Sequence, residues 1–189
     1  MNLYEAIKAR RSVRRFKDNE IEEDTLMRIL DSARYAPTGG NLQPWEFILV
    51  RDKEQKQRLV DYTYTGYEAQ PGNEQKWILE APVVIVVCVD FKRTCARYGE
   101  PGKKIAIMDT SAAIQNMLLA AVEEGVESCW VSGFDVQKIA EVVALPKSIE
   151  PLALLPIGHS AQSSSRPPNK LPLEDIVYKE KYGQSYITD

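Results

Sequence analysis

Residues 108–134 constrain the fold more than any other part of the chain. Asp109 can cap a helix N-terminus and Gly125 can end a helix, and the residues between them are small or apolar on almost every face. This pattern predicts a buried helix over 110–125. At ~1.5 Å per residue it spans about 24 Å, enough to cross a domain. We expect the run to be too short and too interrupted by polar residues to cross a membrane.

The segment after this helix predicts a turn that could approach a ligand. Residues 127–131 are typical of a short buried strand, which leads into Ser132 and Gly133. Because glycine has no Cβ, its backbone can come close to a bound molecule. A helix and strand that lead to such a turn indicate a place for a site, but they do not define its chemistry.

Length and composition predict one domain over residues 1–189. The 189 residues are 44% hydrophobic and carry a net charge of -3, which disfavours nucleic acid and anionic membranes as partners. The three cysteines, Cys88, Cys95 and Cys129, form no CxxC pair, which argues against a disulfide framework and against a zinc site. No apolar signal region is present at the N-terminus. We therefore expect a soluble, cytoplasmic protein.

Hydrophobic periodicity predicts the remaining elements. We expect helices over 3–9, 22–36, 52–62 and 136–143, helical spacing over 73–79, and strands over 46–51, 83–89 and 151–157. The strand 83–89 is apolar throughout, as in a sheet covered on both faces. Residues 91–104 are less regular and predict a mobile loop that could serve as a lid. The serine- and proline-rich stretch 158–172 is expected to be extended.

A basic cluster follows the first predicted helix. It consists of Arg10, Arg11, Ser12, Arg14 and Arg15. Arginine binds phosphate oxygens through two parallel hydrogen bonds, and a serine hydroxyl can complete such a site. The alternative is a solvated surface on which the arginines pair with the acidic run 18–24. On this segment alone, both interpretations remain open.

The loop over residues 37–45 carries amide and hydroxyl groups but no charge. Two glycines and two prolines restrict its conformation. Neutral donors and acceptors suit the edge of a planar heterocycle, whose ring nitrogens and carbonyls need hydrogen-bond partners. The alternative is a tight connection into the next strand, which is the commoner role of a loop.

Four groups of residues together resemble the FMN-dependent nitroreductase family over nearly the whole chain. The groups are Arg10, Arg11, Ser12 and Arg14; residues 36–41 with Gln43, Pro44 and Trp45; Asp109, Ala113, Gln115, Asn116 and residues 125–130; and Pro156, Ile157 and Gly158 with a later basic residue. The resemblance implies an α+β fold of three layers, α/β/α, around a mostly antiparallel sheet. It also implies an interlocked homodimer with flavin sites at the interface, in which the extension 158–189 crosses to the partner.

The resemblance places an FMN cofactor against specific positions. Arg10, Arg11 and Ser12 would hold its phosphate and ribityl chain, helped by Lys170 or, failing that, Arg166. Arg14, Asn73 and Lys76 would reach the pyrimidine edge, where cations stabilise the negative charge that two-electron reduction leaves at N1 and O2.

Three further groups of residues would surround the flavin ring. The second subunit would supply Pro37, Thr38, Gly39 and Asn41. The backbone of Ser132 and Gly133 would approach flavin N5. Tyr64, Tyr67 and Tyr98 would wall the pocket.

The function implied is hydride transfer from NADH or NADPH through flavin N5 to a small oxidised acceptor, a nitroaromatic or a quinone, in a ping-pong cycle. FMN carries the chemistry, so no catalytic side chain and no metal is expected. His159 is expected to have a structural role and Cys95 to be an unpaired thiol. The alternatives are a flavin reductase or reductive dehalogenase of the same family, a non-catalytic flavin-binding module, and a structural dimer whose arginines are merely solvated.

Overall fold

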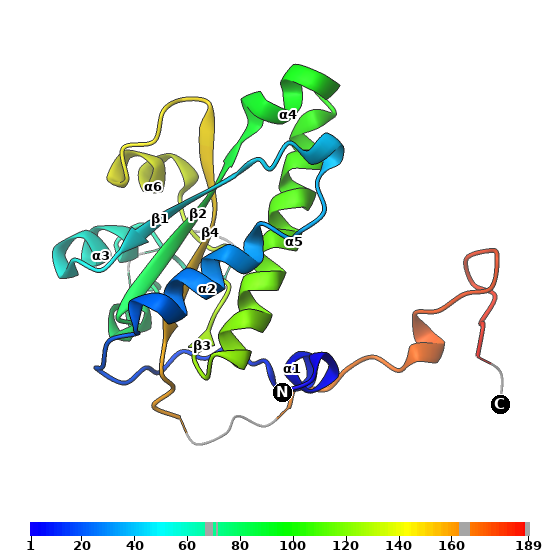
Figure 1. Ribbon diagram of the computed structural model, residues 1–189, viewed down its shortest axis with the longest axis horizontal. Coiled ribbons are helices and arrows are strands. Elements are labelled where there is room, and N and C mark those ends of the chain that lie inside the picture. The colour runs from blue at the N-terminus through cyan, green and yellow to red at the C-terminus, as the bar shows by residue number, and fades with distance from the viewer. Residues whose placement is uncertain (67–69, 71, 163–166, 188–189) are drawn as a thin grey trace.

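The computed structural model describes residues 1–66, 70, 72–162 and 167–187 (Figure 1). Its helices and strands are α1 (Leu3–Ala9), α2 (Glu23–Ala33), β1 (Trp45–Val50), α3 (Lys53–Val60), β2 (Val83–Asp90), α4 (Phe91–Tyr98), α5 (Gly102–Glu123), β3 (Glu127–Ser128), α6 (Val136–Val142) and β4 (Ile149–Gly158). Short 3-10 turns lie at η1 (Gly39–Asn41), η2 (Lys76–Glu80) and η3 (Leu173–Asp175).

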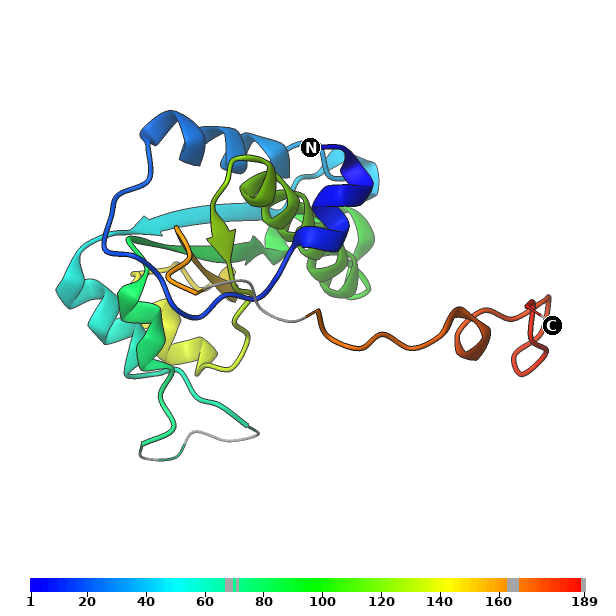
Figure 2. The same cartoon turned by 90° about the horizontal axis from the view of Figure 1, so that it is seen from below.

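The four strands form one antiparallel sheet in the order β1-β2-β4-β3, with helices on both faces (Figures 1 and 2). Strand β2 explains the three layers, because its side chains alternate between two buried clusters. Val83, Ile85 and Val87 pack with residues of α2 and α5, whereas Val84 and Val86 pack with residues of α3 and α6. The predicted α+β fold and its antiparallel sheet are therefore confirmed.

Helix α5 is longer than the sequence predicted. It begins at Gly102 and has 22 residues, so Asp109 lies inside the helix and the prediction that it caps the N-terminus is wrong. By length and composition α5 is apolar enough to cross a membrane, and it is the one helix of this kind within the described part of the chain. Its buried side chains, Ile114 and Met117 among them, pack in the same core as the sheet. This is the position of a core helix, although the length argument against a membrane span was wrong.

The predicted lid over 91–104 is also wrong. These residues form α4 and the first turn of α5. Pro101 directly precedes α5, where a proline ring does not interrupt the helix because the first turn needs no N–H donor. The glycines and the proline therefore mark a corner between two helices and not a mobile loop.

The other predicted boundaries differ by a few residues. The helix expected over 22–36 ends at Ala33, and helical structure near 73–79 is limited to η2. The strand expected over 127–131 contains only Glu127–Ser128, followed by one bridge from Val131 to Leu154.

The C-terminal segment, residues 167–187, extends away from the rest of the protein (Figure 2). Several of its apolar side chains are exposed, namely Leu171, Leu173, Ile176, Tyr182, Tyr186 and Ile187. A single chain leaves this apolar surface uncovered.

Candidate functional site

The basic segment 10–14 lies beside strand β3 at the edge of the sheet. The backbone N–H of Val13 donates to the Ser128 carbonyl at 3.0 Å, and Ser12 forms a parallel bridge with Ser128. Val13 and Phe16 are buried together with Ala81 against Trp77. These two buried anchors and the backbone hydrogen bond therefore fix the segment that carries the arginines and the serine.

Five of the predicted cofactor ligands line one cavity of about 770 Å³, which we call the basic cavity. They are Arg10, Arg11, Ser12, Arg14 and Lys170. The remaining lining residues are Ile7, Lys8, Pro167 and Pro168. The structure thus brings Lys170 to the N-terminal basic cluster. Arg166, the reserve candidate, lies outside the described residues.

Arg11, which lines this cavity, has a buried donor without a partner. Its Nη1 atom donates to the carbonyls of Lys8 at 2.5 Å and Arg10 at 2.9 Å, next to the end of α1. Its Nε atom is buried and has no hydrogen-bond partner. An anionic oxygen would satisfy this donor, whereas an unpaired buried donor is costly. The basic cavity therefore suits a phosphate group.

Arg15 behaves differently from the rest of the basic cluster. Its Nε atom pairs with Glu80 at 3.1 Å, and the same carboxylate oxygen accepts the Phe16 N–H. Among the described residues, no ion pair holds Arg10, Arg11 or Arg14. Pairing with the acidic run 18–24 is thus not what the structure shows for these three.

Two acidic groups, those of half-buried Glu127 and buried Cys129, lie near the arginines of the basic cavity. Burial raises the pKa of the Glu127 carboxyl, although the guanidinium groups of Arg11 and Arg10 lower it in part. One oxygen of this carboxyl is buried without a hydrogen-bond partner. Burial likewise raises the pKa of the Cys129 thiol despite the charge of Arg14. The thiol is therefore protonated at neutral pH.

A second cavity, of about 440 Å³, lies at the turn around Ser132 and Gly133. We call it the turn cavity; it is lined by Tyr64, Thr65, Gly66, Gln75, Trp130, Val131, Ser132 and Gly133. A Cβ atom at Gly133 would lie 2.4 Å from the Tyr64 carbonyl oxygen, so only glycine fits. The predicted residues Tyr64, Ser132 and Gly133 are therefore together.

Gln75 holds this turn and was not predicted from the sequence. Its side-chain amide donates to the carbonyls of Tyr64 at 3.0 Å and Gly133 at 3.3 Å, and its backbone N–H donates to the Thr63 hydroxyl at 2.9 Å. The side chain is only 8% exposed. In the sequence Gln75 is one polar residue among several, and only its burial distinguishes it.

Asn73 and Lys76 lie near the turn cavity but do not line it. The Asn73 amide donates to the Thr65 carbonyl at 3.0 Å. Lys76 is exposed and pairs with Glu74 at 3.7 Å. Arg14 lies over the Trp77 ring, with its guanidinium carbon 5.7 Å from the ring centroid.

The basic cavity and the turn cavity are joined by one short backbone segment. Ser128 is bridged to Ser12, and Ser132 lines the turn cavity four residues later. At ~3.3 Å per residue this segment spans about 13 Å at most. The spacing suits one elongated ligand with an anionic group at one end and a neutral ring system at the other.

The loop over 37–41 lies at the opposite end of α5. The Gly39 N–H donates to the Asp109 carboxylate at 2.9 Å, whereas the N-terminal amino group, next to α1, pairs with Glu123 at 2.9 Å. Asp109 and Glu123 are fourteen positions apart in the helix, which corresponds to about 21 Å. The structure therefore does not bring Pro37, Thr38, Gly39 and Asn41 to the basic cavity of the same chain.

The three tyrosines predicted to wall one pocket do not gather in it. Tyr64 lines the turn cavity, whereas Tyr98 lies beside Gly39 and under the Arg97 guanidinium. Tyr67 lies outside the described residues. His159 contributes its backbone carbonyl, which accepts the Lys17 N–H at 2.8 Å, in keeping with a structural role.

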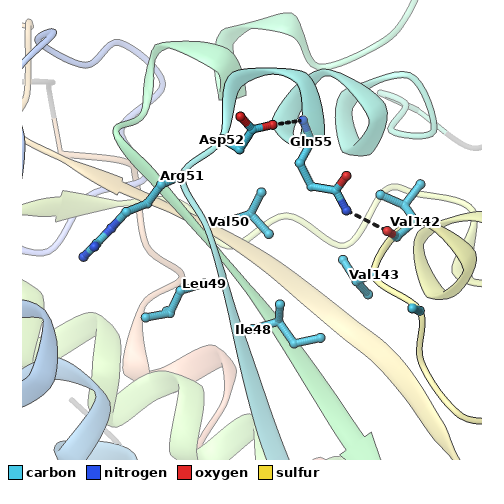
Figure 3. Close-up of a pocket in the computed structure, with 9 residues that line it drawn as sticks. Ile48, Leu49, Val50, Arg51, Asp52, Gln55, Val142 and Val143 are labelled. Atoms are coloured by element: carbon cyan, nitrogen blue, oxygen red, sulfur yellow. Dashed lines mark hydrogen bonds between the residues drawn. The ribbon is translucent and has the colours of Figure 1, made fainter.

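A further cavity, of about 560 Å³, lies between the end of β1 and α6 (Figure 3). Its polar side chains have structural partners. Asp52 accepts the Gln55 N–H at 2.8 Å, and the Gln55 amide donates to the Val142 carbonyl at 2.6 Å (Figure 3). Arg51 pairs with Glu23 at 2.5 Å. No described ionisable group is left over to define a chemical site here.

The fold and both cavities can now be compared with known proteins. A model described as "Nitroreductase family" matches residues 7–159. The chain belongs to the nitroreductase family. A protein of Methanothermobacter thermautotrophicus, whose name suggests an NADH dehydrogenase or NAD(P)H nitroreductase, is 31% identical over 86% of this chain and 80% of its own length.

Solved structures of nitroreductase-family proteins agree with the fold. One from Clostridium difficile 630 is 34% identical and superposes with a TM-score of 0.81, covering 96% of this chain and 99% of its own. A protein from Exiguobacterium sibiricum, solved in complex with FMN, is 22% identical with a TM-score of 0.81 over 95% of this chain and 98% of its own. The prediction of an NAD(P)H-dependent oxidoreductase of the nitroreductase family is confirmed at this level.

Replacing Gln75 by leucine should destabilise the turn around Ser132 and Gly133. The Tyr64 carbonyl loses the Gln75 donor, and the Gly133 carbonyl keeps only the Tyr64 N–H, so we expect the free energy of unfolding to fall by about 1–3 kcal/mol. Denaturant unfolding measures the change, with Gln137→Leu on the exposed surface of α6 as the matched control. Equal stability of the two variants would contradict the structural role of Gln75.

The ionised Glu127 carboxylate should make the folded protein less stable at neutral pH. The carboxyl pKa is raised in the folded state, so its contribution to folding is complete below the ordinary value of 4.5 and is lost as pH rises through the folded pKa. Glu127→Gln stays neutral at every pH. We expect it to be more stable than the wild type at pH 7, by a margin that shrinks toward pH 4.

The measurement is denaturant unfolding at several pH values and one fixed protein concentration. Glu141→Gln, at an exposed position on α6 paired with Lys138, serves as the control and should show no gain at pH 7. A wild type more stable than Glu127→Gln at pH 7 would mean that attraction to Arg11 outweighs burial.

Proposed function

We propose that the protein binds FMN and transfers hydride from NADH or NADPH to a small oxidised acceptor, a nitroaromatic or a quinone. The observation that carries this proposal is the pair of cavities joined by residues 128–132. The basic cavity gathers cations and an unsatisfied donor, and the turn cavity offers neutral backbone groups. The FMN bound to the Exiguobacterium sibiricum protein of the same fold supports the choice of ligand.

Arg10, Arg11, Ser12 and Lys170 would hold the phosphate. The Arg11 Nε atom is a buried donor without a hydrogen-bond acceptor, and Arg10, Ser12 and Lys170 line the same cavity as Arg11. Hydrogen bonds between charged partners are the strong ones, so these residues supply most of the affinity. Arg166 remains the reserve candidate for this role.

Once bound, FMN would supply the chemistry, because its ring accepts hydride from NAD(P)H and passes it to an acceptor. The chain's part is to orient the ring. The backbone of Ser132 and Gly133, held by Gln75 and Tyr64, would face N5. Arg14, with Asn73 and Lys76 close to the turn cavity, would stabilise negative charge at the pyrimidine edge. No side chain is assigned a catalytic proton or a metal.

A homodimer would complete the site. The loop 37–41 lies too far along α5 to reach the basic cavity of its own chain, so a second copy would have to supply Pro37, Thr38, Gly39 and Asn41. Exposed apolar side chains support an interface between two copies. They are Leu3, Tyr4 and Ile7 on α1, Met27 on α2, Tyr35 two residues after α2, and Ile107 and Met108 on α5. The extended segment 167–187 would cross to the same partner and bury its apolar side chains.

An absorbance spectrum of the purified protein tests the proposed function. We expect a flavin spectrum that NADH or NADPH bleaches without oxygen and that a nitroaromatic or quinone restores. A flavin spectrum that neither nucleotide bleaches would favour a binding module. A colourless protein that does not take up FMN would overturn the proposal.

Replacing Arg10 and Ser12 together by alanine should weaken FMN binding. The change removes contacts to a dianion, so we expect a loss of about 2 kcal/mol or more, roughly thirtyfold in affinity. Equilibrium titration with FMN measures it. Arg58→Ala with Ser148→Ala, both at exposed positions outside the two cavities, is the matched control. Unchanged affinity in the first variant would rule out the phosphate assignment.

A further inference from the structure

Asp109 binds a loop that is distant in the sequence. It lies in the second turn of α5, and its Oδ2 atom accepts the Gly39 N–H at 2.9 Å, across 70 residues of sequence. The backbone N–H and C=O groups inside a helix pair with one another, so α5 does not depend on this side-chain contact. The hydrogen bond therefore serves the loop 37–41 and not α5.

The loop is pressed against α5 and α4 at the same place. A Cβ atom at Gly39 would lie 2.9 Å from the Ile105 side chain and 3.3 Å from the Tyr98 ring, so the backbone lies directly on both. The Arg97 guanidinium, stacked on Tyr98, reaches the Gly40 carbonyl at 3.5 Å. Side chains from two helices thus fix both sides of one peptide segment.

The conformation of the loop needs such support. Asn41 and Gln43 have φ angles of 58° and 48°, in the left-handed region that residues with side chains rarely adopt. Backbone of this kind persists when its surroundings hold it in place. Arg93 adds a third contact by donating to the Gln43 carbonyl at 2.9 Å.

We propose that Asp109 is a positioning residue that presents the loop 37–41 to the flavin ring bound by a second copy of the chain, with Arg97 as an auxiliary clamp. This inference rests on the proposed function and extends it to residues outside both cavities. The carboxylate fixes Gly39, and the neighbouring neutral groups of Thr38 and Asn41 then face the ring in one arrangement. The loop would thus contribute to binding of the ring but not of the phosphate.

A comparison of FMN with riboflavin, which lacks the phosphate, separates the two contributions. We expect Asp109→Ala to weaken both ligands by the same factor, about tenfold, because one charge-assisted hydrogen bond is lost. The ratio of FMN affinity to riboflavin affinity should stay at its wild-type value. The variant lacking Arg10 and Ser12 should instead lose affinity for FMN and keep its affinity for riboflavin, so that the ratio falls.

Three control variants accompany this measurement. Asp109→Asn keeps an oxygen acceptor for Gly39 and should bind both ligands more tightly than Asp109→Ala. Arg97→Met changes an exposed side chain, so it tests the clamp even if Asp109→Ala does not fold, and it should weaken both ligands by a smaller equal factor. Asp61→Ala removes an exposed aspartate after α3 and should change neither affinity.

The results separate this inference from the proposed function. Unchanged affinities in folded Asp109→Ala and Arg97→Met, beside a falling ratio in the Arg10 and Ser12 variant, would overturn the positioning role alone. A falling ratio in Asp109→Ala would also overturn it, because the carboxylate would then act on the phosphate. Failure of the wild type to bind either ligand would reject the proposed function itself.

A mixed dimer tests whether the loop acts on the partner. One subunit carries Asp109→Ala, the other carries Arg10→Ala with Ser12→Ala, and two affinity tags isolate the mixed species. If each site combines one chain's cavity with the other chain's loop, one site is fully wild type and the other has both defects. We expect one site per dimer with wild-type affinity for FMN. Two weakened sites per dimer would overturn the inference.

Discussion

The structure depends on the packing of α5 against the sheet. Ile114 and Met117 lie in the core, while Ile107 and Met108 on the same helix remain exposed in one chain. A helix that is apolar on most faces needs cover on more than one side. Its two ends also hold the two separate parts of the candidate site, with the loop 37–41 at one end and α1 at the other. In the proposed homodimer, covering α5 with a second copy and completing the site would therefore be one structural requirement.

Elements with strong local patterns could be predicted from the sequence. The apolar strand at 83–89 follows from its composition, because a strand with buried residues on both faces needs two helical layers. The short helix α1 has the predicted bounds, since Asn2 and Glu5 form a capping box at its start. The corner at 91–104 was misread because Gly99, Pro101 and Gly102 are typical of loops, whereas here they separate two helices.

Parts of the site that depend on long-range contacts could not be predicted. The basic cluster was recognised because its residues are adjacent in the sequence and alike in chemistry. Gln75 and Asp109 were not recognised as site residues, because each acts through a hydrogen bond to backbone far along the chain, across 58 residues for Gly133 and 70 for Gly39. A side chain that binds backbone leaves no paired signal in the sequence, since any residue at the other end supplies the same N–H or C=O.

Net charge is a poor guide to the ligand of this chain. The protein carries a charge of -3, yet the basic cavity is lined by Lys8, Arg10, Arg11, Arg14 and Lys170. Charges interact over only ~8 Å at physiological ionic strength, so a phosphate in this cavity responds to these cations and not to the whole surface. Glu80 engages Arg15, which does not line the cavity, and Glu127 is the acidic group close to Arg10 and Arg11. Burial raises the pKa of this carboxyl against the pull of both guanidinium groups, and among the described residues no ion pair ties it to Arg10 or Arg11.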